Sequence, residues 1–515
     1  MGNVSGNDYT PISLTFKGAG YTVNGMTSTT PKYWNLLGKF YFTLDATKGE
    51  QTIITNETSA YIYNQTSFIS VKADATGGSP SAFIDVGASY WENIGGQTAS
   101  AQKPGFDIQA NTTIGTTAEN YSEDYMVTFE RRSRLNVSNN ATLTIEGGTK
   151  YAYAPVGNEI QTSPTINVAE GSTLYLKGAK NLVGADVSFT VNGTLKLGDN
   201  ASFETTSTAL KTTINNLSTG SNVALVIGNE TQINSGVVLG SLTLKDTANL
   251  SVGDITLNGA YSDSANSKLN YTGKLTYNNG TRFDIKSALV TSGDFEQLSK
   301  NDKGVRIYNA LTLNAGADWI ADGKVDVYEN AVLTINDGAT LTVNGPSSNV
   351  KNARLIFYKN SKVYLNSENC LLTSTQCEIK LATFNTAESA DVYVQANQKF
   401  SSIYVNDSTL NLHMSDGVLL ELTADTTGWA ISGSGDGELR IHNFKEETIK
   451  VYGDEVNVLA GVESYVKLYD ENGTLLGNAT LSNGWITLVA VPEPAEWAMI
   501  LGALALGLAV YRKRK

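Results

Sequence analysis

Three aspartates, spaced four residues apart, form the best local cluster of acidic side chains in the sequence. Asp318, Asp322 and Asp326 lie close to Trp319. Hydrolysis of a glycosidic bond needs two positioned carboxyl groups, so this cluster could serve a glycosidase. Aspartate beside glycine or asparagine is also a common turn residue. We take the structural role as the main interpretation and catalysis as the alternative.

Three arginines and an aromatic segment could also contact sugars. Arg131, Arg132 and Arg134 could bind an acidic sugar or serve a polysaccharide lyase. A run of like charges is usually a solvated face, and we prefer that interpretation. The aromatic side chains between residues 30 and 91 could stack on sugars, but a place in the core is favoured.

The sequence shows no convincing metal or phosphate site. Cys370 and Cys377 are the only cysteines, and the only histidines, His413 and His442, are distant from them in sequence; this is no zinc pattern. The cysteines could form one disulfide or remain small buried hydrophobes. Gly433–Gly437 faintly resembles a calcium-repeat loop, but such loops work in tandem and this one occurs once. There is no phosphate-binding Gly-Lys-Ser motif and no nucleophile elbow, so no cofactor is expected.

Composition indicates a folded and acidic protein. Of the 515 residues, 41% are hydrophobic and 17% are charged, with 48 Gly against 9 Pro. These values exclude a disordered chain, a coiled coil and a helical repeat. The formal net charge of −13 repels phosphate backbones, so no nucleic-acid partner is expected. The last four residues are all basic, an asymmetry typical of an address or a membrane flank.

A short motif recurs along the chain: a small residue, then apolar residues at alternate positions, then Gly, Asn or Asp. The alternation is that of a short strand with one buried face. The closing residues tolerate the positive φ of tight turns. Copies of the motif occupy Ala141–Gly147, Ser172–Gly178, Gly193–Gly198, Gly240–Lys245, Ala331–Asn336 and Ala339–Gly345.

The long spacings between copies suggest one structural turn of about 22 residues, a fixed period that is the signature of a solenoid. Leu174 lies one such period before Leu195, and Leu311 lies one such period before Leu333. The distance along the chain from Leu195 to Leu242 is near two such periods.

Shorter spacings divide each turn into three strands. Leu242, Leu250 and Leu257 follow one another at intervals of 8 and 7. Three such strands fit one coil of a three-faced parallel β-helix, whose stacked coils share one core. A β-sandwich array would instead show hairpin pairs and repeats of about 100 residues. We therefore predict an all-β fold, a right-handed parallel β-helix of roughly 20 coils and on the order of 100 Å long.

The chain is predicted to have four parts. Residues 1–130 are richer in aromatic residues and have a weaker repeat, so we expect an irregular N-terminal part or cap of the same helix. Residues 131–424 carry the coils. Residues 425–490 lose the coil motif and gain longer alternating strands with an Asn472-Gly473 turn, which predicts an antiparallel β cap or small domain. Residues 491–515 form a distinct tail.

The tail contains three consecutive features. Pro492, Glu493 and Pro494 should be extended, because two prolines exclude helix. Thirteen uncharged residues follow, 498–510, and span only about 20 Å as a helix, so crossing a bilayer needs thinning and flanking residues. Arg512, Lys513, Arg514 and Lys515 would hold the end in the cytoplasm. A buried C-terminal helix is the alternative. The expected membrane anchor comprises Trp497, Leu501, Leu504, Leu506, Leu508, Val510 and Tyr511.

This order of features, over 491–515, closely resembles the PEP-CTERM sorting signal of Gram-negative bacteria. The resemblance implies that an exosortase, a membrane cysteine transpeptidase, recognises Pro492–Pro494 and processes the chain nearby. It also implies a temporary anchor at 497–510 and a basic stop at 512–515. Proteins of that family carry an N-terminal secretory signal, whereas Met1–Asp8 has neither a basic nor an apolar region. We favour a truncated or mature-like sequence; a misassigned start and an unused tail are the alternatives. The repeats resemble autotransporter passengers more weakly, by composition.

Together these features predict a non-enzymatic structural or adhesin-like protein of the cell surface or extracellular matrix. We expect it to be exported, with transient anchoring in the inner membrane through the C-terminal transmembrane helix. The expected partners are an exosortase-type enzyme, the membrane, and extracellular polysaccharide or host glycans. The alternative is a secreted β-helical polysaccharide lyase or glycoside hydrolase, which a groove lined by stacked carboxylates and aromatics would favour.

Overall fold

The computed structural model describes residues 105–489 with short gaps, together with the N-terminal strands and four residues of the tail. The gaps are 117, 120, 122, 131, 153–162, 299–302, 345–353, 373–379, 384–388 and 425–427. The earlier described segments are 12–17, 22–24, 34–36, 40–45, 51–54, 62–64, 68–72, 81–86 and 91–94. The later ones are 502–504 and 512.

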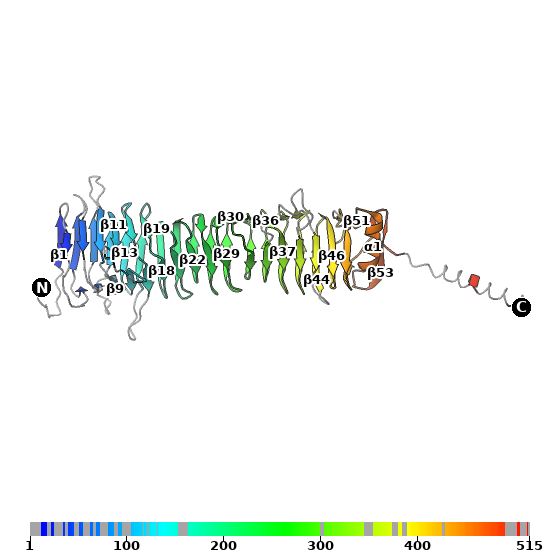
Figure 1. Cartoon of the computed structure of the whole chain (residues 1–515), viewed down its shortest axis with the longest axis horizontal. Coiled ribbons are helices and arrows are strands. Elements are labelled where there is room, and N and C mark those ends of the chain that lie inside the picture. Colours follow the sequence, from blue (N-terminus) through cyan, green and yellow to red (C-terminus); the bar gives the residue numbers. More distant parts are fainter. Residues whose placement is uncertain are drawn as a thin grey trace.

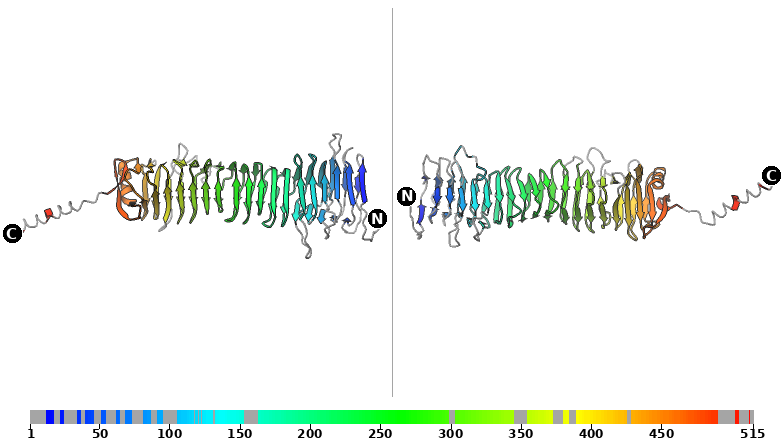
Figure 2. Two further views of the ribbon diagram at one scale, coloured as in Figure 1. Left: turned by 180° about the vertical axis from the view of Figure 1, so that it is seen from behind. Right: turned by 90° about the horizontal axis from the view of Figure 1, so that it is seen from below.

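The described chain winds into a long rod with its strands across the long axis (Figure 1). Successive strands lie on three faces in turn, so that each strand pairs with strands one coil away. Pairing is parallel from β1 to β52, and the same stack is seen from behind and from below in Figure 2. The predicted all-β solenoid of parallel strands is confirmed.

Face 1 is the stack to which the first strand of each coil belongs. Its strands are β1 (Ile12–Lys17), β4 (Phe40–Asp45), β7 (Phe68–Lys72), β10 (Gly105–Ile108), β13 (Arg134–Val137), β16 (Thr165–Val168), β19 (Ser188–Leu197), β21 (Lys211–Thr219), β23 (Glu230–Ile233), β26 (Asn249–Val252), β29 (Lys268–Tyr271), β32 (Ala288–Thr291), β35 (Ala310–Leu313), β38 (Val332–Ile335), β41 (Lys362–Leu365), β44 (Ser389–Val394), β47 (Thr409–Met414), β50 (Glu438–His442) and β52 (Val466–Tyr469).

Face 2 follows face 1 in each coil, and the second halves of β19 and β21 also belong to it. Its other strands are β2 (Thr22–Asn24), β5 (Gln51–Ile54), β8 (Ser81–Asp85), β11 (Asn111–Gly115), β14 (Thr142–Ile145), β17 (Thr173–Leu176), β24 (Val237–Leu239), β27 (Ile255–Leu257), β30 (Lys274–Tyr277), β33 (Asp294–Gln297), β36 (Asp318–Asp322), β39 (Thr340–Asn344), β42 (Leu371–Leu372), β45 (Gln398–Phe400), β48 (Leu420–Leu422) and β51 (Ile449–Val451).

Face 3 completes each coil. Its strands are β3 (Trp34–Leu36), β6 (Ile62–Asn64), β9 (Trp91–Ile94), β12 (Val127–Glu130), β15 (Thr149–Ala152), β18 (Lys180–Val183), β20 (Ser202–Thr205), β22 (Ala224–Ile227), β25 (Ser241–Leu244), β28 (Tyr261–Ser262), β31 (Phe283–Ile285), β34 (Val305–Ile307), β37 (Lys324–Val327), β40 (Arg354–Phe357), β43 (Lys380–Thr383), β46 (Ser402–Asn406) and β49 (Ile431–Ser434).

The register confirms the coil length read from the sequence. Leu174 pairs with Leu195, and Leu311 pairs with Leu333, so each of these spacings is one coil. The three leucines Leu242, Leu250 and Leu257 also lie on three different faces, in β25, β26 and β27. One coil therefore contains three strands, as the short spacing predicts.

One inferred repeat was wrong. Leu195 pairs with Leu217 on face 2, whereas Leu242 pairs with Leu225 on face 3, so the spacing from Leu195 to Leu242 is not two periods of one stack. The reason is that all three faces carry the same small–apolar motif, so the motif itself does not say which face it belongs to. Coil length also varies, because the coil from Leu225 to Leu242 is several residues shorter than other coils of the rod.

In the interior of the rod, apolar side chains from neighbouring coils pack against one another. In β19, alternate residues are buried and exposed along the whole strand. Five aromatic rings from faces 1 and 3 contact one another in a row through the core, with neighbouring centroids 5.2 to 6.0 Å apart. Each aromatic contact adds about 0.5–1.5 kcal/mol beyond burial of its area. The stacked rings are Phe106, Phe129, Tyr151, Phe189 and Phe203.

The C-terminal end of the solenoid is closed by a helix and two antiparallel strands. Helix α1 (Glu455–Tyr465) takes the place of a face 3 strand, and β53 (Leu475–Ser482) and β54 (Trp485–Leu488) follow β52. β53 pairs antiparallel with β52 and β54, and β54 pairs with β51. The edges of faces 1 and 2 are thereby covered, which removes the open edge that another chain could extend.

Antiparallel pairing begins later than the sequence predicts for residues 425–490. β50 pairs in parallel with β47, and β51 with β48. The alternating pattern of these strands does not indicate the direction of pairing, because period-two alternation is the same in parallel and antiparallel sheets. Helix α1 was not anticipated; the Asp454 carboxylate begins it by accepting the backbone N–H groups of Val456 and Asn457.

Helix α1 lies directly on the edge of β49. A Cβ atom at Gly461 would be 2.0 Å from the Ile431 carbonyl oxygen, so only glycine allows this approach. The Tyr465 hydroxyl donates to the Gly433 carbonyl oxygen at 2.9 Å. Polar groups at the edge of face 3 are therefore shielded by the helix rather than paired with a further strand.

The tail is described at only a few positions. Among the described residues no helix is long and apolar enough to cross a membrane. Leu504 is in a short helical segment and its side chain is 59% exposed, and Arg512 is exposed. The remaining predicted sorting, anchor and stop residues lie outside the described residues: Pro492, Glu493, Pro494, Trp497, Leu501, Leu506, Leu508, Val510, Tyr511, Lys513, Arg514 and Lys515.

The glycine contact predicts how the end of the solenoid responds to overpacking. Gly461→Leu should push α1 away from β49 and cost about 1–3 kcal/mol locally. Hydrogen exchange at the amides of 431–434, measured by mass spectrometry, should then be about tenfold faster or more. Ala460→Leu, on the exposed side of the same helix, is the control and should leave the exchange unchanged. Equal exchange in both variants would contradict the shielding role of α1.

Candidate functional site

The three aspartates of the predicted cluster are not brought together. Asp318 lies on face 2 and is exposed, where it accepts the Thr340 hydroxyl at 2.7 Å. Asp326 lies on the outer side of face 3 and is 1% exposed. Trp319 is fully buried in the core, with its indole N–H donating to the Gly293 carbonyl oxygen at 3.3 Å. Asp318 and Asp326, which lie on different faces, therefore do not form the paired carboxylates that glycoside hydrolysis requires.

Asp322 and Asp326 are held by contacts between neighbouring coils. Asp322 ends β36, is 9% exposed, and donates its backbone N–H to the Gln297 side chain at 3.2 Å. Asp326 lies 3.7 Å from the Arg306 Nε and 3.8 Å from the Lys324 Nζ. Burial raises the pKa of Asp326, while Lys324 and Arg306 oppose that shift. This local ion cluster ties neighbouring face 3 strands together.

The two described arginines of the predicted cluster, Arg132 and Arg134, do not form an exposed basic pair. Arg132 is 7% exposed and has a φ of 56°, so it sits in a tight corner. Arg134 is half-buried in β13, where its backbone packs against Gly105. Arg131 lies outside the described residues.

Cys370 is a buried free thiol rather than an exposed reactive group. It donates to the Gln398 side-chain oxygen at 3.6 Å, and burial raises its pKa to about 11. Cys377, the other half of the disulfide alternative, lies outside the described residues.

The two histidines are neighbours in space. His413 and His442 pair across β47 and β50, with ring centroids 4.7 Å apart. The two residues are one coil apart in the sequence, and that coil is a long one. Among the described residues no group of three His, Cys, Asp or Glu could hold a metal ion, so this histidine pair lacks the further ligands that a zinc site needs there.

These histidines belong to a stack of five rings along the outer side of face 1, which we call the ring ladder. The rings come from β41, β44, β47, β50 and β52, and neighbouring centroids are 4.4 to 4.9 Å apart. Interplanar angles of 8° to 20° make them nearly parallel, so their edges face solvent. The ladder consists of Tyr364, Tyr393, His413, His442 and Tyr469.

Burial and neighbouring groups shift the pKa values of Asp391, beside the ring ladder, and of His442, within it. The His413 Nε2 lies 3.0 Å from the Asp391 Oδ1, and this hydrogen bond is the main reason that the pKa of Asp391 is lowered. Burial lowers the pKa of His442, and the nearby His413 and Arg440 lower it further, whereas Asp391 acts in the opposite direction. The ring ladder was not predicted from the sequence. Its signal there is a ring at or next to the last residue of strands one coil apart.

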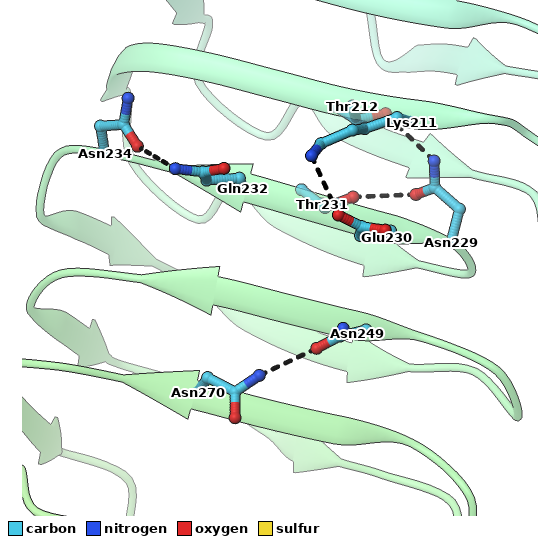
Figure 3. Close-up of polar contacts among 9 residues, drawn as sticks. All are labelled: Lys211, Thr212, Asn229, Glu230, Thr231, Gln232, Asn234, Asn249 and Asn270. Atoms are coloured by element: carbon cyan, nitrogen blue, oxygen red, sulfur yellow. Dashed lines mark hydrogen bonds and ion pairs between the residues drawn. The ribbon is translucent and has the colours of Figure 1, made fainter.

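Amide side chains form similar ladders elsewhere on the rod. In Figure 3 the Asn270 Nδ2 donates to the Asn249 Oδ1 at 2.8 Å, across β26 and β29. The Gln232 amide donates to the Asn234 Oδ1 at 2.9 Å within the same coil. Lys211 and Glu230 pair across the neighbouring strands at 3.0 Å. Side-chain contacts thus reinforce the backbone stacking outside the core.

A buried polar bridge lies beside these exposed contacts. Asn229 is 3% exposed; its Oδ1 accepts the Thr231 hydroxyl at 2.8 Å and its Nδ2 donates to the Thr212 hydroxyl at 3.3 Å (Figure 3). Both threonines are also buried, so each polar atom needs its partner within the protein. The bridge fixes the corner between two coils.

A polar pocket of about 440 Å³ lies where the last coils meet the terminal helix and strands. At its side, Glu438 accepts hydrogen bonds from both Arg440 and Lys467. Burial tends to raise the pKa of Glu438, but these two cations outweigh it and lower the pKa. The lining residues are Thr409, Gly435, Asp436, Gly437, Glu438, Arg440, Glu463, Ser464, Tyr465, Val466, Lys467 and Asn478.

The fold and these surfaces define a class of protein: an all-β solenoid with ladders of polar and aromatic side chains on its outer faces. No family model, no curated protein and no solved structure matches the chain.

The buried bridge predicts a local cost for losing one amide. Asn229→Ala leaves two buried hydroxyls without this partner and should destabilise the coil by about 1–3 kcal/mol. Hydrogen exchange of the amides in β21 and β23 should rise accordingly. Asn234→Ala, at the other end of β23, is the matched control; it loses only exposed hydrogen bonds and should have a smaller effect. No difference between the two variants would contradict the bridge.

The ring ladder predicts a pH dependence of local stability. The pKa of His442 lies below its ordinary value of 6.5, so the folded chain binds this proton more weakly than the unfolded chain does. The stabilisation is complete above about pH 6.5 and declines as the pH falls below it. Hydrogen exchange of the β50 and β52 amides, corrected for intrinsic rates, should therefore become faster as the pH is lowered from 7 to 5.

Replacing the histidine supplies the control for that dependence. His442→Phe keeps a stacked ring without a titrating group, so the increase in exchange over this pH range should become smaller. An unchanged pH profile in the variant would show that another group is responsible.

Proposed function

We propose that this chain is a non-enzymatic surface or matrix rod of a Gram-negative bacterium, exported and then processed at its C-terminal sorting signal. The observation that carries the proposal is the continuous stack of coils with ladders on the outer faces, such as the ring ladder and the amide pairs of Figure 3. Such a body supplies length and a repeated adhesive surface. We further propose that the coils wind right-handed, the usual hand of parallel crossover connections.

The enzyme alternative has less support. Its best candidate, the cluster around Asp318 and Asp326, is divided between faces 2 and 3, and Trp319 points into the core. Polysaccharide cleavage needs convergent acid and base groups. We therefore assign the polar faces to structure and adhesion, with extracellular polysaccharide or host glycans as partners.

The route to the surface is proposed from the tail sequence. An exosortase-type enzyme would recognise Pro492–Pro494, the apolar segment 497–510 would be a temporary transmembrane anchor, and the basic residues 512–515 would remain in the cytoplasm. The anionic body fits this location, because a solvated acidic surface favours solubility outside the cell.

Processing can be tested by intact mass. The chain, expressed with its native upstream region in a host that carries an exosortase, should be shortened near Pro492 and found outside the cell. Replacing Pro492, Glu493 and Pro494 together by alanine should abolish the shortening, because the recognition element is lost. Glu496→Ala is the control and should be processed normally. An uncut cytoplasmic product from the unsubstituted chain would overturn the proposed function.

A further inference from the structure

We propose that the polar pocket between the last coils and the terminal cap binds one sugar unit of a neutral or amino-sugar glycan. This inference rests on the proposed function as an extracellular rod, and it names a place and a ligand class for adhesion. The pocket lies at the end of the repeat and not on its regular faces. It forms where the repeat stops and helix α1 and β53 turn across the end of β50 and β52.

The pocket's wall is preformed by the glycine-rich loop that the sequence analysis singled out. Gly435 has a φ of +61°, and a Cβ atom there would overlap the Asp407 carboxylate. The same carboxylate accepts the Asp436 backbone N–H at 3.1 Å. At Gly437 a Cβ atom would approach the Val405 carbonyl oxygen to 2.8 Å. The loop therefore lies flat against β46, and its bare backbone leaves the pocket open.

Three charged groups of the pocket hold one another in place before any ligand arrives. The Glu438 side chain is 13% exposed and accepts hydrogen bonds from Arg440, at 2.5 Å, and from Lys467. The cations keep this carboxyl ionised by lowering its pKa. The Arg440 and Lys467 side chains remain 41% and 44% exposed, so they can still donate to a ligand. Preorganisation of this kind reduces the entropy lost on binding.

The lining suits a molecule with many hydroxyl groups. The lining contains both donors (Thr409, Arg440, Lys467, Asn478) and carboxylate acceptors (Asp436, Glu438, Glu463). A sugar presents adjacent hydroxyls that both donate and accept, so it can satisfy both kinds of group. The volume of about 440 Å³ lies within the usual range of small-molecule sites.

The charge balance of the pocket selects among sugars. Three carboxylates against two cations give a formal charge of −1, which disfavours uronic and other acidic sugars and favours neutral or amino sugars. A metal ion is a poorer candidate, because no three acidic, histidine or cysteine side chains in the described part of the chain are placed to ligate one.

The ring ladder borders the pocket and gives a bound glycan a direction in which to extend. Arg440 and Lys467 precede His442 and Tyr469 by two residues on β50 and β52, and alternate residues of a strand project to the same side. The exposed edges of the rings present hydroxyl and imidazole groups next to the sugar site. Further units of an oligosaccharide would therefore lie across these edges.

The test is calorimetric titration of the full chain, purified in detergent, with named probes. These are N-acetylglucosamine, its trimer, glucosamine and tri-galacturonic acid. We expect binding of at least one neutral or amino sugar, tighter for the trimer than for the monomer, and none of the galacturonate. Absence of binding to every probe, or preferential binding of the galacturonate, would overturn the proposal.

Two variants locate the binding in the pocket. Glu463→Gln and Asn478→Ala replace exposed lining residues and should weaken binding about tenfold each without changing the melting temperature. Glu296→Gln, which breaks an exposed ion pair with Lys274 on face 2, is the matched control and should bind like the original chain. Equal binding in all three variants would place the sugar elsewhere and refute the site.

Failure of sugar binding can be distinguished from failure of the proposed processing. A chain that is shortened and exported but binds none of the probes would refute the pocket alone. A chain that stays uncut in the cytoplasm but binds sugar through Glu463 and Asn478 would refute the proposed function and leave the pocket in place.

Discussion

Backbone hydrogen bonds between parallel strands, in register from one coil to the next, hold this rod together. Because the register carries each side chain over its equivalent, leucine stacks on leucine inside, as in the Leu311–Leu333 pair. No coil could bury its apolar residues alone, so the core exists only when coils are stacked. The side-chain ladders on the outer faces and the closed C-terminal end both follow from this repeated contact.

On the outer faces the same register places like polar groups together. Amides tolerate this because each can both donate and accept, as Asn249 and Asn270 do (Figure 3). Aromatic rings at equivalent positions stack on one another. Some charged residues at equivalent positions have opposite signs, as Lys211 and Glu230 do. The low charged fraction and the abundance of asparagine and threonine follow from this constraint, since a ladder of one charge would repel itself.

The repeat creates a difficulty at its end, where unpaired strand edges would invite further chains. Here α1 shields face 3 while β53 and β54 close faces 1 and 2. Turning the chain across the stack also breaks its smooth surface, and the polar pocket lies at that break. Stability of the end and a specific concave site therefore have the same structural origin.

Alternation and turn residues are local properties, so the amino-acid sequence alone predicts the strand motif, a coil of about 22 residues and the three strands of each coil. It also carries the tail signal, which is a linear pattern. Which face each motif joins depends on the folded structure, as Leu195 and Leu242 illustrate, because coil lengths vary and the three faces share one motif. The meeting of His413 with His442, the separation of Asp318 from Asp326 and the pocket beside α1 likewise depend on long-range register, which no local pattern encodes.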